Sequence, residues 1–232
     1  MMNPMDPTLR TPRRGFLGRL FAGTAALAVA GVTPGRLGAA ERGSPIGGAH
    51  PGDDWMHELK GKHRTVFDMS AHKNGKPLSQ AANYLNAWRD AFGVPERDVN
   101  LVFGMHGEAI PVVLNDALWS RFKLGEQYDV MDAGTKTPSA RNPFSAVNAA
   151  ASKLLTAEQS VETLQQRGVR FIVCMNTIAG ATMKLSSAGF GTTDAVRAAI
   201  MGGLLPGVIT VPAMVVALTQ LQEHGVKYTK IA

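Results

Sequence analysis

Residues 64–231 alternate between two hydrophobic patterns, and this alternation limits the possible folds more than any other feature of the sequence. Short runs rich in β-branched and aromatic residues are typical of buried strands. These runs are residues 65–69, 101–105, 169–173, 207–211 and 228–231. Segments with helical periodicity lie between them, at residues 78–92, 161–167, 194–205 and 213–224. The sequence therefore predicts one three-layer α/β domain, with about five parallel strands and helices on both faces of the sheet.

Glycines mark the ends of two predicted helices. Gly168 follows the helical segment 161–167, and Gly225 follows the segment 213–224. Glycine adopts the left-handed backbone conformation that ends many helices without steric cost. Both helices are therefore expected to end at these residues.

Size and charge exclude several classes of protein. The chain has 232 residues, of which 45% are hydrophobic and 18% charged, so it is too apolar to be disordered and long enough to bury a core. The net charge of +6 arises mainly in residues 1–40, which hold five arginines and one acidic residue. The rest of the chain carries 19 basic and 17 acidic residues. We therefore expect no nucleic-acid partner.

Residues 1–40 have the layout of an export signal. The pair Arg13-Arg14 is followed by a mildly apolar run at residues 16–32 and then by small residues that end at Ala40. A twin-arginine pair ahead of a weakly apolar segment is typical of a Tat signal peptide. We therefore expect the Tat translocase to be a partner during export, with cleavage near Ala40 and a periplasmic location.

The same apolar run is a poor candidate for a permanent membrane anchor. It is interrupted by Arg19, is rich in Ala and Gly, and is shorter than the roughly 20 apolar residues that span a bilayer. Residues 41–63 are expected to form a linker and N-terminal extension, because residues 43–52 have low complexity. The folded domain is expected to comprise residues 64–232.

The chain contains a single cysteine, Cys174, which follows the predicted strand 169–173. One cysteine excludes an intrachain disulfide and a zinc or iron–sulfur site built from several cysteines. Two alternatives remain for its role. It is a small buried hydrophobic residue at the end of a strand, or it is a nucleophile whose thiolate is stabilised at the N-terminus of the next helix, 177–187.

Polar residues also follow the strand that ends near residue 105. The carboxyl ends of parallel strands meet at one edge of a sheet, where ligands bind in many α/β proteins, so His106, Glu108 and Asn176 are candidates for a site with Cys174. His106 accepts the proton of the thiol, ligates the same ion, or is only a hydrogen-bonded rim residue. Glu108 alternatively favours the dipole of a helix that begins near Pro111.

Five segments carry a resemblance to a known family. They are residues 106–111, 114–119, 141–144, 168–176 and 204–218, and they span most of the predicted domain. In this order they resemble exported members of the DsrE/DsrF-like superfamily. That resemblance implies a flavodoxin-like sheet, a homo-oligomer such as a trimer or hexamer, and a sulfur atom carried as a persulfide on a cysteine at a strand end. Cys174 matches that cysteine.

The resemblance also implies a sulfur donor or acceptor protein as a possible partner, although the relatives with sulfur-relay roles act inside the cell. Arg141 is a candidate for holding an anionic group. Asn142 is a further ligand-binding candidate, with loop geometry as its alternative role. A homo-oligomer is also suggested by apolar residues near the loops, namely Ile110, Val112, Val113 and residues 204–206, which a monomer would be expected to expose.

A binding module without catalytic activity is the alternative to sulfur relay. Thioether, imidazole and thiolate groups follow three predicted strands, and such ligands suit Cu(I) in an exported protein. The groups are Met105 with His106, Cys174 with Met175, and Met69 with His72. The sequence predicts neither a particular cofactor nor whether the protein turns over a substrate.

Overall fold

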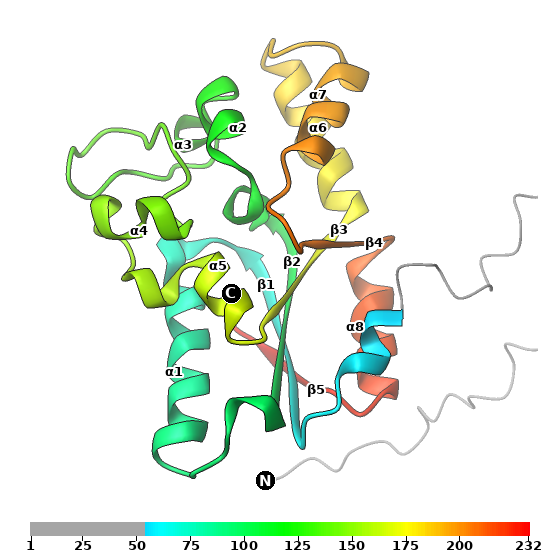
Figure 1. Ribbon diagram of the computed structural model, residues 1–232. Helices are drawn as coiled ribbons and strands as arrows, with labels where there is room; N and C mark the ends of the chain where they lie inside the picture. The colour runs from blue at the N-terminus through cyan, green and yellow to red at the C-terminus, as the bar shows by residue number, and fades with distance from the viewer. Residues whose placement is uncertain (1–53) are drawn as a thin grey trace, which may run out of the picture. The chain divides into compact units, whose positions relative to one another are not determined.

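A computed structural model describes residues 54–232 of the chain and contains a five-stranded parallel sheet (Figure 1). The strands are β1 (His63–Ala71), β2 (Val99–Glu108), β3 (Arg170–Cys174), β4 (Ile209–Val211) and β5 (Lys227–Lys230). They lie in the order β4-β3-β2-β1-β5, and every neighbouring pair is parallel. The predicted three-layer, flavodoxin-like α/β fold is confirmed.

The strand order explains which helices cover which face. From β1 to β4 each step moves to the next strand in the same direction, so right-handed crossovers place the intervening helices on one face. The connection from β4 to β5 crosses back over the sheet and places its helix on the opposite face. Figure 1 shows α1 and α5 on one side of the sheet and α8 on the other.

The helices on the first face are α1 (Lys76–Asp90), α2 (Asp116–Arg121), α3 (Leu124–Gln127), α4 (Ala146–Ser152), α5 (Val161–Gln166), α6 (Met175–Ser187) and α7 (Thr193–Gly202). The helix on the second face is α8 (Met214–Glu223). The predicted helix ends are confirmed at Gly168 and Gly225, which adopt left-handed φ values of 87° and 77°. Short 3₁₀ turns complete the chain: η1 (Asp54–Glu58), η2 (Lys73–Gly75), η3 (Glu96–Asp98), η4 (Ile110–Val113) and η5 (Ala157–Gln159).

Alternating strand residues divide the interior into two cores. Side chains on successive strand residues point to opposite faces, so Phe67 and Phe103 enter the core under α1 while Val66 and Val102 enter the core under α8. In the larger core Phe103 is fully buried and its ring stacks on Phe171, with centroids 5.2 Å apart. This face is closed by continuous apolar packing.

The smaller core is closed partly by the segment that precedes β1. Trp55, Met56 and Leu59 are buried against the same side of the sheet as α8. The second half of segment 41–63 is therefore an N-terminal extension that packs on the domain. Residues 1–40 and the low-complexity stretch 43–52 lie outside the described residues, so the predicted signal and linker stay predictions.

Two further findings bear on the sequence-based expectations. Ile110, Val112 and Val113 are fully buried within the protomer, because η4 turns them into the larger core. The inference that a monomer would expose them is wrong, and they give no reason for a homo-oligomer. No helix among residues 54–232 is both long enough and apolar enough to cross a membrane.

Candidate functional site

The site lies where two neighbouring strands send their chains to opposite faces of the sheet. β3 leads into α6, which contributes Ile178 and Leu185 to the larger core. β4, its neighbour, leads into α8, which packs on the smaller core. Such a divergence leaves a crevice beyond the carboxyl ends of the strands, and ligands of open α/β sheets bind there.

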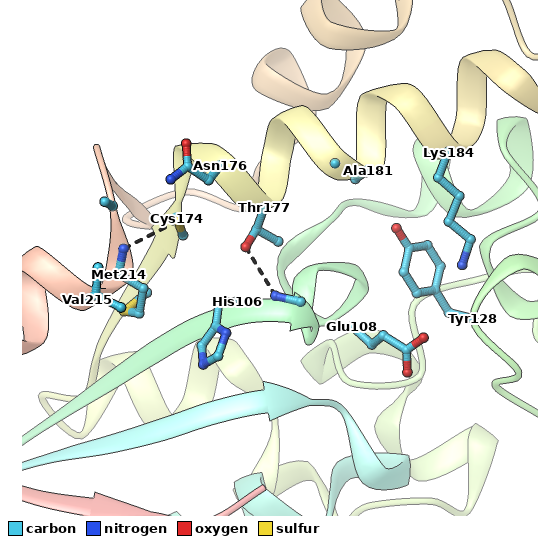
Figure 2. Close-up of a pocket in the computed structure, with 13 residues that line it drawn as sticks. His106, Glu108, Tyr128, Cys174, Asn176, Thr177, Ala181, Lys184, Met214 and Val215 are labelled. Atoms are coloured by element: carbon cyan, nitrogen blue, oxygen red, sulfur yellow. Dashed lines mark hydrogen bonds between the residues drawn. The ribbon is translucent and has the colours of Figure 1, made fainter.

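A cavity of about 470 Å³ occupies this crevice. Its walls come from the end of β2, from one face of α6, from the first turn of α8 and from Tyr128. Figure 2 shows Cys174 and Met214 at one end of the cavity and Glu108, Tyr128 and Lys184 at the other. The volume is within the range of small-molecule sites.

Cys174 is placed between the N-termini of two helices. It is the last residue of β3 and the N-cap of α6, and its Sγ accepts a hydrogen bond of 3.3 Å from the backbone N–H of Met214, in the first turn of α8. The residue is only 5% exposed, so access to the sulfur runs through the cavity. Backbone N–H groups in the first turn of a helix have no partner within the helix, and the N–H of Met214 finds one in the sulfur.

Gly104 allows α8 to approach the sheet at this point. A Cβ atom on Gly104 would lie 2.8 Å from Sδ of Met214. Gly104 shares the α8 side of β2 with Val102 and His106, because side chains alternate along a strand. Because Gly104 has no side chain, Met214 has room to pack there. The first turn of α8 therefore lies close enough for the backbone N–H of Met214 to contact Cys174.

His106 turns toward β1 and is held by a buried carboxylate. Its Nε2 lies 2.8 Å from Oδ1 of Asp68, whose side chain is only 8% exposed (Figure 2 shows the ring pointing to β1). The hydroxyl of Tyr228, on β5, donates to Oδ2 of the same carboxylate at 2.7 Å. The sequence predicted that His106 accepts the proton of Cys174. Among the described residues, the two side chains form no direct hydrogen bond.

One face of α6 lines the middle of the cavity. The lining residues Thr177, Gly180, Ala181 and Lys184 are at positions i, i+3, i+4 and i+7, which share one face of a helix. The Thr177 hydroxyl accepts a hydrogen bond of 3.1 Å from the backbone N–H of Gly107, which ties α6 to the end of β2. Gly180 has no atom within 4 Å of the position of a Cβ, so the space beside it is open.

The other end of the cavity combines an aromatic ring with charged groups. The Lys184 ammonium lies 3.9 Å from the ring centroid of Tyr128 and donates to the carbonyl of Gln127 at 2.5 Å. Burial raises the pKa of the Tyr128 hydroxyl to about 12, and the nearby charge of Glu108 adds to this. The phenol is therefore a neutral hydrogen-bonding group at physiological pH.

His72 holds the backbone of Tyr128 in place. Its Nδ1 accepts from the N–H of Asn74 at 3.1 Å, so Nε2 carries the proton and donates to the carbonyl of Tyr128 at 2.9 Å. Burial lowers the pKa of His72, which keeps the ring neutral. Both ring nitrogens are occupied, so His72 is not free to ligate a metal.

Four of the six predicted site residues line this cavity, namely His106, Glu108, Cys174 and Asn176. Arg141 is exposed and lines a separate cavity near Asp132. Asn142 is fully buried and anchors a loop, because its amide nitrogen donates to the carbonyls of Val112 and Leu114 at 3.0 and 2.8 Å. The structure therefore does not bring these last two residues to the site.

The methionines predicted as soft-metal ligands do not join His106 and Cys174. Met69 and Met105 point into the larger core, on the side of the sheet opposite Cys174, because side chains alternate along the strands. Met175 packs against that larger core as well. Within residues 54–232 no group of three or more His, Cys, Asp or Glu side chains is arranged to hold a metal ion.

Sequence reasoning missed Asp68, Tyr228, Tyr128 and Lys184. For Asp68 a signal was present, because it is the one acidic residue within the apolar strand pattern of residues 65–69. A carboxylate at such a position requires buried hydrogen-bonding partners. Tyr128 and Lys184 line the cavity and Tyr228 bonds to Asp68 because of tertiary structure, and no local pattern distinguishes these three residues.

Comparisons with known proteins give no family assignment. No family model matches the chain, and no curated protein matches it. A solved protein of unknown function from Methanobacterium thermoautotrophicum is 16% identical, and the alignment covers 73% of this chain and 99% of that one with a TM-score of 0.39. The resemblance to the DsrE/DsrF-like superfamily therefore stays a prediction.

Proposed function

We propose that this protein is an exported, DsrE-like protein that binds or relays a sulfur species as a persulfide on Cys174. The observation that carries the proposal is the position of the Cys174 sulfur, which lines a cavity and accepts the N–H of Met214 at the start of α8. A backbone N–H at a helix N-terminus interacts favourably with a negatively charged group, and the thiolate is the form of cysteine that attacks sulfur.

The transfer step is an exchange between a thiol and a persulfide. The Cys174 thiolate attacks the outer sulfur of a donor R–S–SH, the new S–S bond forms at Sγ, and the S–S bond of the donor breaks. The donor leaves as the thiolate R–S⁻ and takes up the proton that Cys174 released. The outer sulfur keeps its oxidation state, so no oxidant is required, and the reverse step passes the sulfur to an acceptor.

The size of the cavity suits a small sulfur donor or acceptor group rather than a folded domain of a partner protein. Its volume of about 470 Å³ suits a small molecule or the end of a flexible segment from a partner protein. Thr177, Gly180 and Ala181 form a wall of small side chains along it. A group that enters near Lys184 can therefore extend along α6 toward Cys174.

Intact mass measurement tests the proposal. Reduced protein is incubated with inorganic polysulfide, separated from it and weighed before and after treatment with a reductant. We expect wild type to gain the mass of one sulfur atom that the reductant removes, and Cys174→Ala to gain none. A mass that polysulfide does not change, together with stoichiometric copper by elemental analysis, would instead identify a metal-binding module.

The predicted export completes the proposal. Replacing Arg13 and Arg14 with Lys is expected to leave the precursor in the cytoplasm, because the Tat translocase requires the arginine pair. Cell fractionation measures this, and mature protein in the periplasm of the double variant would contradict the Tat assignment.

We also propose that the protein forms a homo-oligomer, as the family resemblance implies. Exposed apolar residues on the surface support this proposal. Examples are Val215 and Val216 on α8, which are 73% and 52% exposed. Light scattering at micromolar concentration is expected to return a trimer or hexamer, and the mass of one chain would contradict the proposal.

A further inference from the structure

Four side chains form a row across the α8 face of the sheet, one from each of four adjacent strands. In strand order they are Cys174 on β3, His106 on β2, Asp68 on β1 and Tyr228 on β5. Met105 and Val173 are register partners, so the residues that follow them, His106 and Cys174, are neighbours on the opposite face. His106 then contacts Asp68, and Asp68 contacts Tyr228.

The hydrogen bonds in this row determine which nitrogen of His106 carries the proton. A carboxylate only accepts hydrogen bonds, and Asp68 is approached by the Tyr228 hydroxyl at Oδ2 and by Nε2 of His106 at Oδ1. Nε2 of the neutral imidazole must therefore be protonated. Nδ1 consequently carries the lone pair and is the ring atom able to accept a proton.

We propose that Asp68 and Tyr228 are positioning residues that hold His106 in the Nε2–H form, so that its Nδ1 accepts the proton of Cys174 and returns it to the leaving thiolate. This inference rests on the proposed function. The proton is passed directly or through one water molecule, and the positive imidazolium that forms is stabilised by the Asp68 carboxylate.

The surroundings of His106 agree with this role. Its side chain is 33% exposed and lines the cavity, while that of Asp68 is buried. The hydrogen bond to Asp68 raises the pKa of Tyr228, as expected where a phenol donates to a charged carboxylate.

The strands on this part of the sheet carry several titratable or charged residues, of which Asp68 bonds to the His106 ring. They are Asp68 on β1, Glu108 on β2, Cys174 on β3, and Tyr228 and Lys230 on β5. The near end of α8 contributes backbone N–H groups and Met214 rather than a charged side chain. Asp68 is the acidic residue bonded to the ring, so its charge is the one that the test removes.

Ring ¹⁵N NMR of the full chain labelled in histidine tests the positioning directly. The signal of His106 is assigned by its loss in His106→Gln, and the tautomer is determined at a pH where the ring is neutral. We expect the Nε2–H form in wild type, a mixture of both forms in Asp68→Asn, and an unchanged spectrum in Asp90→Asn, a matched control on the exposed end of α1. A wild-type ring with its proton on Nδ1 would overturn the inference.

A double-mutant cycle tests the action on Cys174. The rate of Cys174 alkylation by iodoacetamide is measured near pH 7. Asp68→Asn and His106→Gln are each expected to slow it roughly 10- to 100-fold, and the double variant no further, because Asp68 acts through His106. Tyr228→Phe, a half-exposed position where folding is not at risk, is expected to slow it about threefold.

The outcomes separate this inference from the proposed function. If polysulfide does not load wild type but the cycle is non-additive, the relay function fails and the positioning stands. If polysulfide loads Cys174 but iodoacetamide alkylates Asp68→Asn at the wild-type rate, the positioning role is overturned. Where Asp68→Asn does not fold, Tyr228→Phe takes its place in this comparison. Additive effects in the cycle would also overturn it, because Asp68 would then act independently of His106.

Discussion

The two faces of the sheet are covered to different extents, and this difference locates the site. The first face is packed under helices α1 to α7, with fully buried aromatic residues such as Phe103 and Phe171. The second face is covered by α8 and η1, and the row of Cys174, His106, Asp68 and Tyr228 crosses it, with Cys174 bonded to the start of α8. The closed face provides stability, and the partly covered face presents Cys174 and His106 to the cavity.

The difference in coverage between the two faces follows from topology rather than from composition. Three successive crossovers run in one direction and one runs back, so among residues 54–232 one face receives seven α-helices and the other receives one. A single helix of ten residues cannot cover a sheet of five strands. Strand ends beside the N-terminus of α8 are therefore left partly uncovered by the fold, and the backbone N–H of Met214 there donates to Cys174.

The largest expected effect is on the closed face. Phe103→Ala removes a fully buried ring that stacks on Phe171, and we expect a loss of about 3–5 kcal/mol in the free energy of unfolding. Cys174→Ala on the other face is expected to cost about 1 kcal/mol or less while abolishing sulfur loading. Urea unfolding of both variants measures this, and equal losses would contradict the division between the two faces.

The next effect concerns the strand end that carries His106. Gly107 has a φ of 57°, and a Cβ atom there would lie 2.8 Å from the carbonyl oxygen of Ser70. We expect Gly107→Ala to destabilise the protein by about 1–3 kcal/mol, because both the backbone conformation and the contact are unfavourable. Thermal unfolding measures the change. A variant as stable as wild type would show that this strand end is not constrained.

A change of opposite sign is expected in the middle of α6. Gly180 is helical and has open space beside it, so Gly180→Ala should stabilise the protein by about 1 kcal/mol. Gly180→Leu places a larger side chain into the cavity and should slow alkylation of Cys174 without unfolding the protein. If Gly180→Leu left the alkylation rate unchanged, access to the sulfur would not run along α6.

The smallest expected effect is a pH dependence at His72. Its lowered pKa means that the unfolded chain binds a proton more readily than the folded chain. Above a pH of about 6.5, the pKa of the ring in the unfolded chain, the neutral ring costs no stability. Stability is lost as the pH falls from there toward the pKa of the ring in the folded chain. His72→Gln should reduce the difference between urea midpoints at pH 7.5 and 5.5, and an unchanged difference would contradict this account.

The sequence predicted the sheet better than the layer that covers it. The strands were predicted because β-branched and aromatic runs are local signals, and α8 because its helical period ends at Gly225. The region between η4 and α5 was not predicted, because its short helices depend on contacts between distant residues. Asn142, for example, joins the loop before α4 to the carbonyls of Val112 and Leu114.

The site was predicted only in part, for a related reason. Cys174 was placed at the end of a strand and the start of a helix from its neighbours in the sequence. Its bond to Met214 and the pairing of His106 with Asp68 connect residues 40 and 38 positions apart. These contacts depend on strand order and register, which the order of elements along the chain does not specify.

The central claim is that Cys174 is a reactive thiol in the folded protein rather than a buried structural residue. The most direct measurement is its alkylation by iodoacetamide at neutral pH, with and without denaturant, followed by intact mass. We predict that the folded protein is modified at Cys174 through the cavity, faster than free cysteine after allowance for the intrinsic nucleophilicity of the thiolate. Modification only after denaturation would contradict the claim.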